Sequence, residues 1–125
     1  MTRNLTLLGA TGSIGASALD VIARHPDRFH VHALTAQTRV DELVELCARF
    51  RPAVAVIGDP SLEGRLREAL RSRGLRTVGR GGAAALSDVA QAEEVDRVLA
   101  SIMGPPGLMP TLAAALAGKR LLLAN

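Results

Sequence analysis

The stretch Leu5-Thr-Leu-Leu-Gly9-Ala-Thr-Gly12-Ser-Ile-Gly15 decides the fold of this 125-residue chain. An apolar run over residues 5–8 stops at the first glycine, and two more glycines follow at intervals of three. Beyond them, apolar residues recur at helical spacing and predict a helix whose inward face carries Ile14, Ala18, Val21 and Ile22. The order strand, glycine turn, helix is the one that a phosphate-binding turn requires.

Each glycine of this turn has a physical reason to lack a side chain. Gly9 permits a sharp exit from the strand, Gly12 lets the main chain approach a diphosphate, and Gly15 lets the helix pack closely on the strand. The free amides at the helix start attract an anion, and Thr11 and Ser13 can add hydroxyl donors. The spacing therefore favours a nucleotide-binding turn, with a purely structural strand-to-helix turn as the alternative.

Composition excludes several classes of protein. The chain is 48% hydrophobic and has a net charge of +3, and no apolar run approaches the length of a membrane span. The core must be aliphatic because the chain has two Phe and neither Trp nor Tyr. Its arginines are scattered and no aromatic residues are interleaved with them, so we expect no nucleic-acid surface. We expect a cytoplasmic protein, since no signal peptide is apparent and the single Cys47 allows no internal disulfide.

The second predicted strand, Phe29 to Leu34, bears on the choice of cofactor. NAD-selective proteins place an acid near the end of this strand, where it binds the ribose 2′-hydroxyl. Here the strand continues into Thr35-Ala-Gln37-Thr38-Arg39, with no acid before Asp41. An arginine suits a 2′-phosphate in shape and charge, so the sequence favours NADP. The alternative is that Arg39 is a solvated loop residue.

Three other groups of polar residues are interpreted as structural. His30 and His32 share one strand face but no third metal ligand is in view, so we expect a polar face. Cys47 lies in the apolar stripe of a helix that we predict over residues 40–50, so we expect a buried thiol. The acids Glu93, Glu94 and Asp96 precede a predicted strand, on the side opposite to the one where ligands bind.

The rest of the chain alternates between predicted strands and helices. The further strands are expected at 53–57, 76–79, 97–102 and 121–125, and helices at 62–70, 83–90 and from Pro110 onward. We interpret Gly79 to Ala85 as a flexible connection, residues 101–107 as a loop, and Leu112, Ala115 and Leu116 as inward-facing. This alternation predicts an α/β fold, a Rossmann-like doubly wound parallel sheet with helices on both faces.

Several motifs of the chain, taken in order, resemble one enzyme family. The chain is similar to the amino-terminal NADPH-binding domain of the 1-deoxy-D-xylulose 5-phosphate reductoisomerases. The resemblance rests on Leu8 to Gly15, Leu19-Asp-Val, His25-Pro-Asp-Arg-Phe, Ala33-Leu-Thr-Ala, Gly107-Leu-Met-Pro-Thr-Leu-Ala-Ala and Gly118-Lys-Arg-Leu-Leu-Leu-Ala-Asn125. The resemblance implies an oxidoreductase of isoprene biosynthesis that converts 1-deoxy-D-xylulose 5-phosphate to 2-C-methyl-D-erythritol 4-phosphate. Such an enzyme uses NADPH and a divalent metal ion, Mg or Mn.

The resemblance also implies roles for individual residues. Thr11, Gly12, Ser13 and Ile14 would hold the NADPH diphosphate. Gln37, Thr38 and Arg39 would lie by the adenosine 2′-phosphate, Asn125 near the nicotinamide, and residues 100–104 along the path between them. The family usually has a Gly-Lys-Asn-like segment where this chain has Gln-Thr-Arg, so the cation is displaced by one residue.

Residues 1–125 are expected to form one NADPH-binding domain, the cofactor half of a larger enzyme. They contain no paired carboxylates in a cleft, no Ser-His-Asp set and no complete metal site, so we assign no catalytic residue and no metal ligand. The metal-binding acids would lie beyond residue 125, and the complete enzyme would be a cytoplasmic homodimer acting on a phosphosugar. Two alternatives remain: another NADP oxidoreductase, such as a semialdehyde dehydrogenase, and a stand-alone nucleotide-sensing module.

Overall fold

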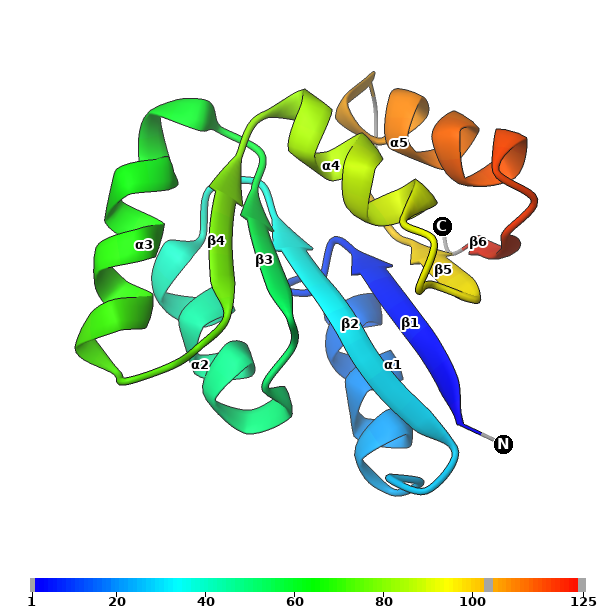
Figure 1. Ribbon diagram of the computed structural model, residues 1–125, viewed down its shortest axis with the longest axis horizontal. Coiled ribbons are helices and arrows are strands. Elements are labelled where there is room, and N and C mark those ends of the chain that lie inside the picture. The colour runs from blue at the N-terminus through cyan, green and yellow to red at the C-terminus, as the bar shows by residue number, and fades with distance from the viewer. Residues whose placement is uncertain (1, 103–104, 124–125) are drawn as a thin grey trace.

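Across residues 2–102 and 105–123, the part of the chain that this computed structural model describes, six parallel strands form one sheet (Figure 1). The strands are β1 (Arg3–Leu8), β2 (Phe29–Ala36), β3 (Val54–Ile57), β4 (Val78–Gly81), β5 (Arg97–Ala100) and β6 (Arg120–Leu123). Their order is β4-β3-β2-β1-β5-β6. The chain winds outward from β1 through β4 and then crosses to β5 on the other side. The carboxyl ends of β1 and β5 therefore form the switch point at which such sheets bind ligands.

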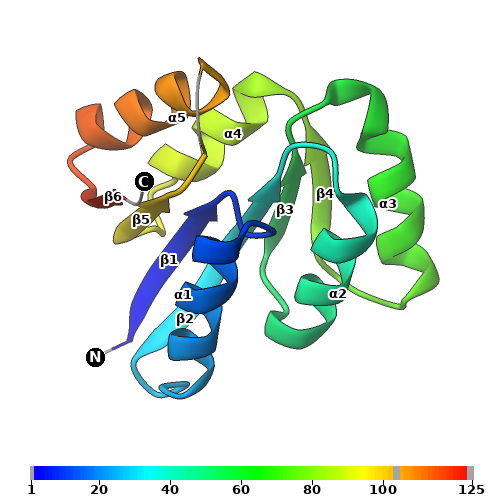
Figure 2. The same cartoon turned by 180° about the vertical axis from the view of Figure 1, so that it is seen from behind.

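Helices cover both faces of the sheet, as Figures 1 and 2 show from opposite sides. The helices are α1 (Ser13–Ala23), α2 (Val40–Phe50), the 3-10 turn η1 (Pro60–Leu62), α3 (Glu63–Ser72), α4 (Ala83–Gln91) and α5 (Pro105–Leu116). One core cluster joins α1, α2 and α3 to one face of the sheet, and a second joins α4 and α5 to the other. Alternate residues of β1 enter the two clusters, Leu7 the first and Leu8 the second. The predicted Rossmann-like doubly wound sheet is confirmed.

The inward face of α1 differs from the prediction. Gly15, Leu19 and Ile22 are buried, whereas Ile14 and Val21 are 38% and 52% exposed. The helix turns its glycine toward the preceding strand because only that position can approach the backbone of residues 9 and 10. The larger side chain of Ile14 is left beside the turn.

The predicted flexible connection at Gly79 to Ala85 is wrong, because Gly79 and Gly81 lie in strand β4 and Gly82 is the N-cap of α4. A Cβ on Gly79 would lie 3.0 Å from Leu70 Cδ1, and one on Gly81 would lie 2.8 Å from Glu63 Cβ. The glycines thus let α3 lie directly on the strand. Glu63 and Arg67, one helical turn apart in α3, form an ion pair at 3.5 Å. The same Glu63 carboxylate accepts a hydrogen bond from the Gly81 amide at 2.8 Å, which links α3 to β4.

The last helix also departs from the prediction. It begins at Pro105 rather than Pro110, which lies inside it, and its buried residues are Gly107, Pro110 and Ala114. Gly107 is required for this orientation, because a Cβ there would lie 2.5 Å from the Ile102 carbonyl oxygen. The residues predicted to face inward are exposed instead. The apolar surface of α5 and β6 consists of Leu108, Met109, Leu112, Leu116, Leu122 and Leu123.

Within residues 2–102 and 105–123, no three His, Cys, Asp or Glu side chains lie close enough together to hold a metal ion. None of the helices in those ranges is long and apolar enough to cross a membrane.

Candidate cofactor site

The glycine turn is held at the carboxyl end of β1 by the two neighbouring strands. On one side the Gly9 amide donates to Thr35 Oγ1 at 2.9 Å, and the Ala10 amide donates to the Thr35 carbonyl at 2.7 Å. On the other side the Ser101 hydroxyl lies 2.9 Å from the carbonyl oxygens of both Leu8 and Gly9. The turn is thus rigidly placed at the switch point of the sheet.

The three glycines differ in what surrounds them. Gly9 has φ +87°, a conformation that residues with side chains rarely adopt. Gly15 has no room for a side chain, because a Cβ would lie 2.5 Å from the Gly9 carbonyl oxygen and 2.7 Å from that of Ala10. Gly12 is the opposite case, since a Cβ there meets nothing within 4 Å. The open space at Gly12 is where an anion can approach the main chain.

The amino terminus of α1 offers unoccupied amide donors to that space. Gly12 is the N-cap of the helix and, lacking a side chain, provides no capping hydrogen bond. The first amides of a helix have no partner within it and carry the positive end of the helix dipole. Because no acid stands in the first turn of α1, these groups are free to bind phosphate.

A hollow of about 200 Å³ joins the glycine turn to the loop after β2. It is lined by Gly9, Thr11, Gly12, Ala36, Gln37, Thr38, Arg39, Ser101 and Ile102. Residues from the carboxyl ends of β1, β2 and β5 therefore meet at one place. The structure brings together five of the eight residues that the sequence predicted for the cofactor: Thr11, Gly12, Gln37, Thr38 and Arg39.

The other three predicted residues lie outside the lining of this hollow. Ser13 and Ile14 form the exposed first turn of α1 beside it. Asn125 lies outside the described residues. Ser101 is a residue whose role the sequence did not reveal, because its bonds to Leu8 and Gly9 span more than 90 positions of sequence.

The electrostatics of the hollow centre on Arg39. Its guanidinium lies 3.3 Å from the Glu42 carboxylate, and both side chains are more than half exposed. Exposed ion pairs contribute at most about 1 kcal/mol, so a phosphate group that reaches Arg39 can replace this partner. The sequence shows no acid at the end of β2. It did not identify Glu42 as the partner of Arg39.

Residues interpreted from the sequence as structural, such as Cys47 and Asp96, do not line this hollow. Cys47 is fully buried, and burial raises the pKa of its thiol to about 12, which confirms a core thiol. Asp96 Oδ2 accepts a hydrogen bond from the Asn4 amide at 2.8 Å, at the amino end of β5. Glu93, Glu94 and Asp96 are all exposed, and their interpretation as structural residues is confirmed.

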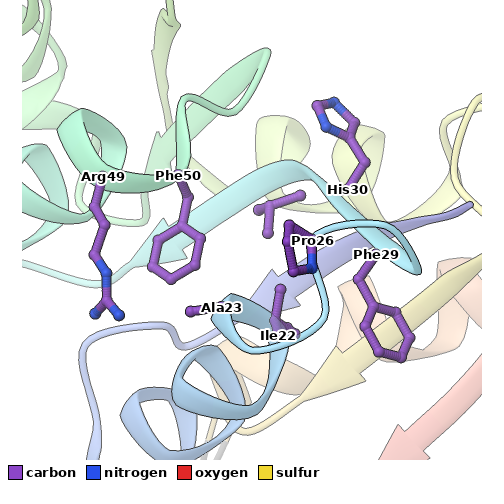
Figure 3. A pocket seen from close by; sticks show the side chains of 8 residues that line it. Ile22, Ala23, Pro26, Phe29, His30, Arg49 and Phe50 are labelled. Carbon is purple, nitrogen blue, oxygen red and sulfur yellow. The ribbon is translucent and has the colours of Figure 1, made fainter.

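A second hollow lies at the opposite end of the sheet (Figure 3). It measures about 320 Å³ and lies between the end of α1, the start of β2 and the end of α2. His30 lines it, and the Arg49 guanidinium lies 5.0 Å from the centre of the Phe50 ring. It is larger than the hollow at the glycine turn, but it lies at the amino end of β2, away from the switch point, so the hollow at the turn is the better candidate for a cofactor site.

The fold and this turn define the class of the protein: a Rossmann-type dinucleotide-binding domain. The family model for 1-deoxy-D-xylulose 5-phosphate reductoisomerase matches residues 5–125. The chain belongs to the 1-deoxy-D-xylulose 5-phosphate reductoisomerase family.

Individual relatives agree with this assignment. The chain is 56% identical over 123 residues to the reductoisomerase of Janthinobacterium sp. (strain Marseille), covering 98% of this chain and 32% of that protein. It is 55% identical over 125 residues to that of Paraburkholderia phymatum, covering 100% and 31%. The chain therefore spans about a third of the length of these curated relatives.

Solved structures show the same likeness in three dimensions. A reductoisomerase in complex with magnesium matches with a TM-score of 0.97 at 45% identity, covering 100% of this chain and 31% of that one. The Zymomonas mobilis enzyme in complex with NADPH matches with a TM-score of 0.93 at 46% identity, covering 100% and 32%.

Proposed function

We propose that this chain is the NADPH-binding part of an enzyme that converts 1-deoxy-D-xylulose 5-phosphate to 2-C-methyl-D-erythritol 4-phosphate. The observation that carries the proposal is the open, uncapped amino terminus of α1, which shares one hollow with Arg39. The family to which the chain belongs supplies the reaction. It also favours the reductoisomerase over a semialdehyde dehydrogenase or a stand-alone nucleotide sensor.

In this proposal each predicted residue has a position-specific role. The amides of Gly12, Ser13 and Ile14, with the hydroxyls of Thr11 and Ser13, bind the diphosphate. The loop of Gln37, Thr38 and Arg39 lies by the adenosine 2′-phosphate, with Arg39 supplying the charge. Asn125 lies near the nicotinamide. The bound NADPH supplies the hydride for the reduction.

The remaining properties of the complete enzyme are proposals that rest on the family. Its Mg or Mn ligands would come from residues beyond this chain. We propose that the complete enzyme is a cytoplasmic homodimer with a phosphosugar substrate and that neither nucleic acid nor membrane is a partner.

The cofactor assignment is tested with Arg39→Ala. A charge-assisted hydrogen bond contributes about 1.5–3 kcal/mol, and we expect the lower end because Arg39 is largely exposed. The variant should weaken NADPH binding about tenfold and leave NADH binding nearly unchanged, and added salt should reduce the difference. Both affinities can be measured by calorimetric titration.

Arg71→Ala provides a matched control. Arg71 also forms an exposed ion pair with an acid three positions away, Glu68, at 3.2 Å, but it lies in α3 and does not line the hollow. It should change neither affinity. Equal losses of NADPH and NADH with Arg39→Ala would show that Arg39 supports the loop instead of binding the phosphate.

A further inference from the structure

A contact between two loops borders the proposed cofactor hollow. Gly58 follows β3, and Gln37 follows the neighbouring strand β2. The carboxamide of Gln37 lies over Gly58, where a side chain would otherwise stand. A Cβ on Gly58 would overlap the Gln37 Oε1 atom and would lie 2.6 Å from Cδ and 3.2 Å from Nε2. The glycine therefore provides the space that this carboxamide occupies.

The main chain around this contact is fixed. The Gly58 amide donates to the Ala36 carbonyl at 2.7 Å, and the Asp59 amide donates to the Gln37 carbonyl at 3.0 Å. These bonds continue the pairing of β2 with β3 into the two loops. A clash at Gly58 would thus be relieved first by the Gln37 side chain, which ends in rotatable bonds, and not by the backbone.

Space, and not backbone conformation, is the reason for a glycine at this position. The glycines with positive φ are Gly9, Gly74, Gly82 and Gly118 among the described residues, and Gly58 is not one of them. An alanine could adopt the backbone of residue 58, so only its methyl group would oppose Gln37. The substitution Gly58→Ala is therefore a specific probe of this contact.

We propose that Gly58 is a positioning residue for the cofactor's 2′-phosphate. It holds the Gln37 carboxamide against the end of β3 and so keeps the hollow open beside Thr38 and Arg39. This inference rests on the proposed NADPH function. With alanine at position 58, the displaced carboxamide enters the hollow next to the loop, where it obstructs a 2′-phosphate but not the free hydroxyl of NADH.

The test is a double-mutant cycle of Gly58→Ala and Gln37→Gly on the full chain, with NADPH and NADH affinities measured by titration. Gly58→Ala should weaken NADPH about tenfold relative to NADH. When Gly58→Ala is added to Gln37→Gly, the ratio of the two affinities should change by less than about twofold, because the clashing side chain is gone. Gly64→Ala is the matched control: a Cβ there meets nothing within 4 Å, and the ratio should not change.

Urea unfolding of the same variants tests the contact without any cofactor. Gly58→Ala should lower the free energy of unfolding less in the Gln37→Gly background than in the original chain, because the side chain that meets the new methyl group is absent there. An equal effect of Gly58→Ala in both backgrounds, or equal losses of both cofactors, would overturn the inference. If the unmodified chain binds no NADPH, the proposed function fails, and the unfolding cycle still shows whether Gln37 and Gly58 are coupled.

Discussion

At the scale of single residues, the three glycines of the turn look alike in sequence but meet different physical demands. Gly9 is needed for its positive φ, Gly15 for the close approach of α1 to the preceding carbonyls, and Gly12 for open space. Only the last demand concerns a ligand. Substitution of Gly15 should therefore reduce stability, whereas substitution of Gly12 should mainly reduce cofactor binding.

We predict that Gly15→Ala lowers the free energy of unfolding by at least about 2 kcal/mol, because its methyl group overlaps backbone atoms that cannot move aside. Gly12→Val should cost about 1 kcal/mol or less, as an unfavourable N-cap, yet abolish NADPH binding by filling the space of the diphosphate. Urea unfolding and calorimetric titration measure the two effects. A folded Gly12→Val variant with unchanged affinity would show that the turn is only structural.

At the scale of elements, α5 shows how small residues can orient an apolar helix. The helix is apolar almost all round, so hydrophobic spacing gives no strong preference for one face. Its buried residues include Gly107 and Ala114, and larger side chains such as Leu116 point outward. Small residues let α5 approach α4 and the end of β5, so close packing decides the orientation.

This orientation gives opposite expectations for two substitutions in α5. Leu116→Ser should change the free energy of unfolding by less than about 0.5 kcal/mol, since its side chain is 81% exposed. Ala114→Leu should destabilise the chain by about 1–3 kcal/mol, since Ala114 is fully buried. Chemical unfolding of both variants measures these two changes in the free energy of unfolding. A larger loss from Leu116→Ser than from Ala114→Leu would place the packed face where the sequence first suggested.

At the scale of the whole molecule, the candidate cofactor site accounts for one part of the activity proposed for the complete enzyme. No metal-binding cluster is present in residues 2–102 and 105–123, and the chain spans about a third of its relatives' length. We therefore predict that the 125-residue chain binds NADPH but does not oxidise it with 1-deoxy-D-xylulose 5-phosphate and Mg²⁺ or Mn²⁺. The absorbance of NADPH measures this directly. Oxidation of NADPH in a preparation free of any longer enzyme would contradict this prediction.

The sequence by itself determined the alternation of strands and helices, the glycine turn and the loop that carries Arg39. These features depend on local periodicity and on the backbone preferences of a few residues, as at Gly9. The tertiary structure alone decided that Gly81 belongs to a strand and that Gln37 lies over Gly58. Each of those outcomes depends on a neighbour distant in sequence or on another strand. Whether a side chain fits a given space is decided by the atoms that fill it from elsewhere in the chain.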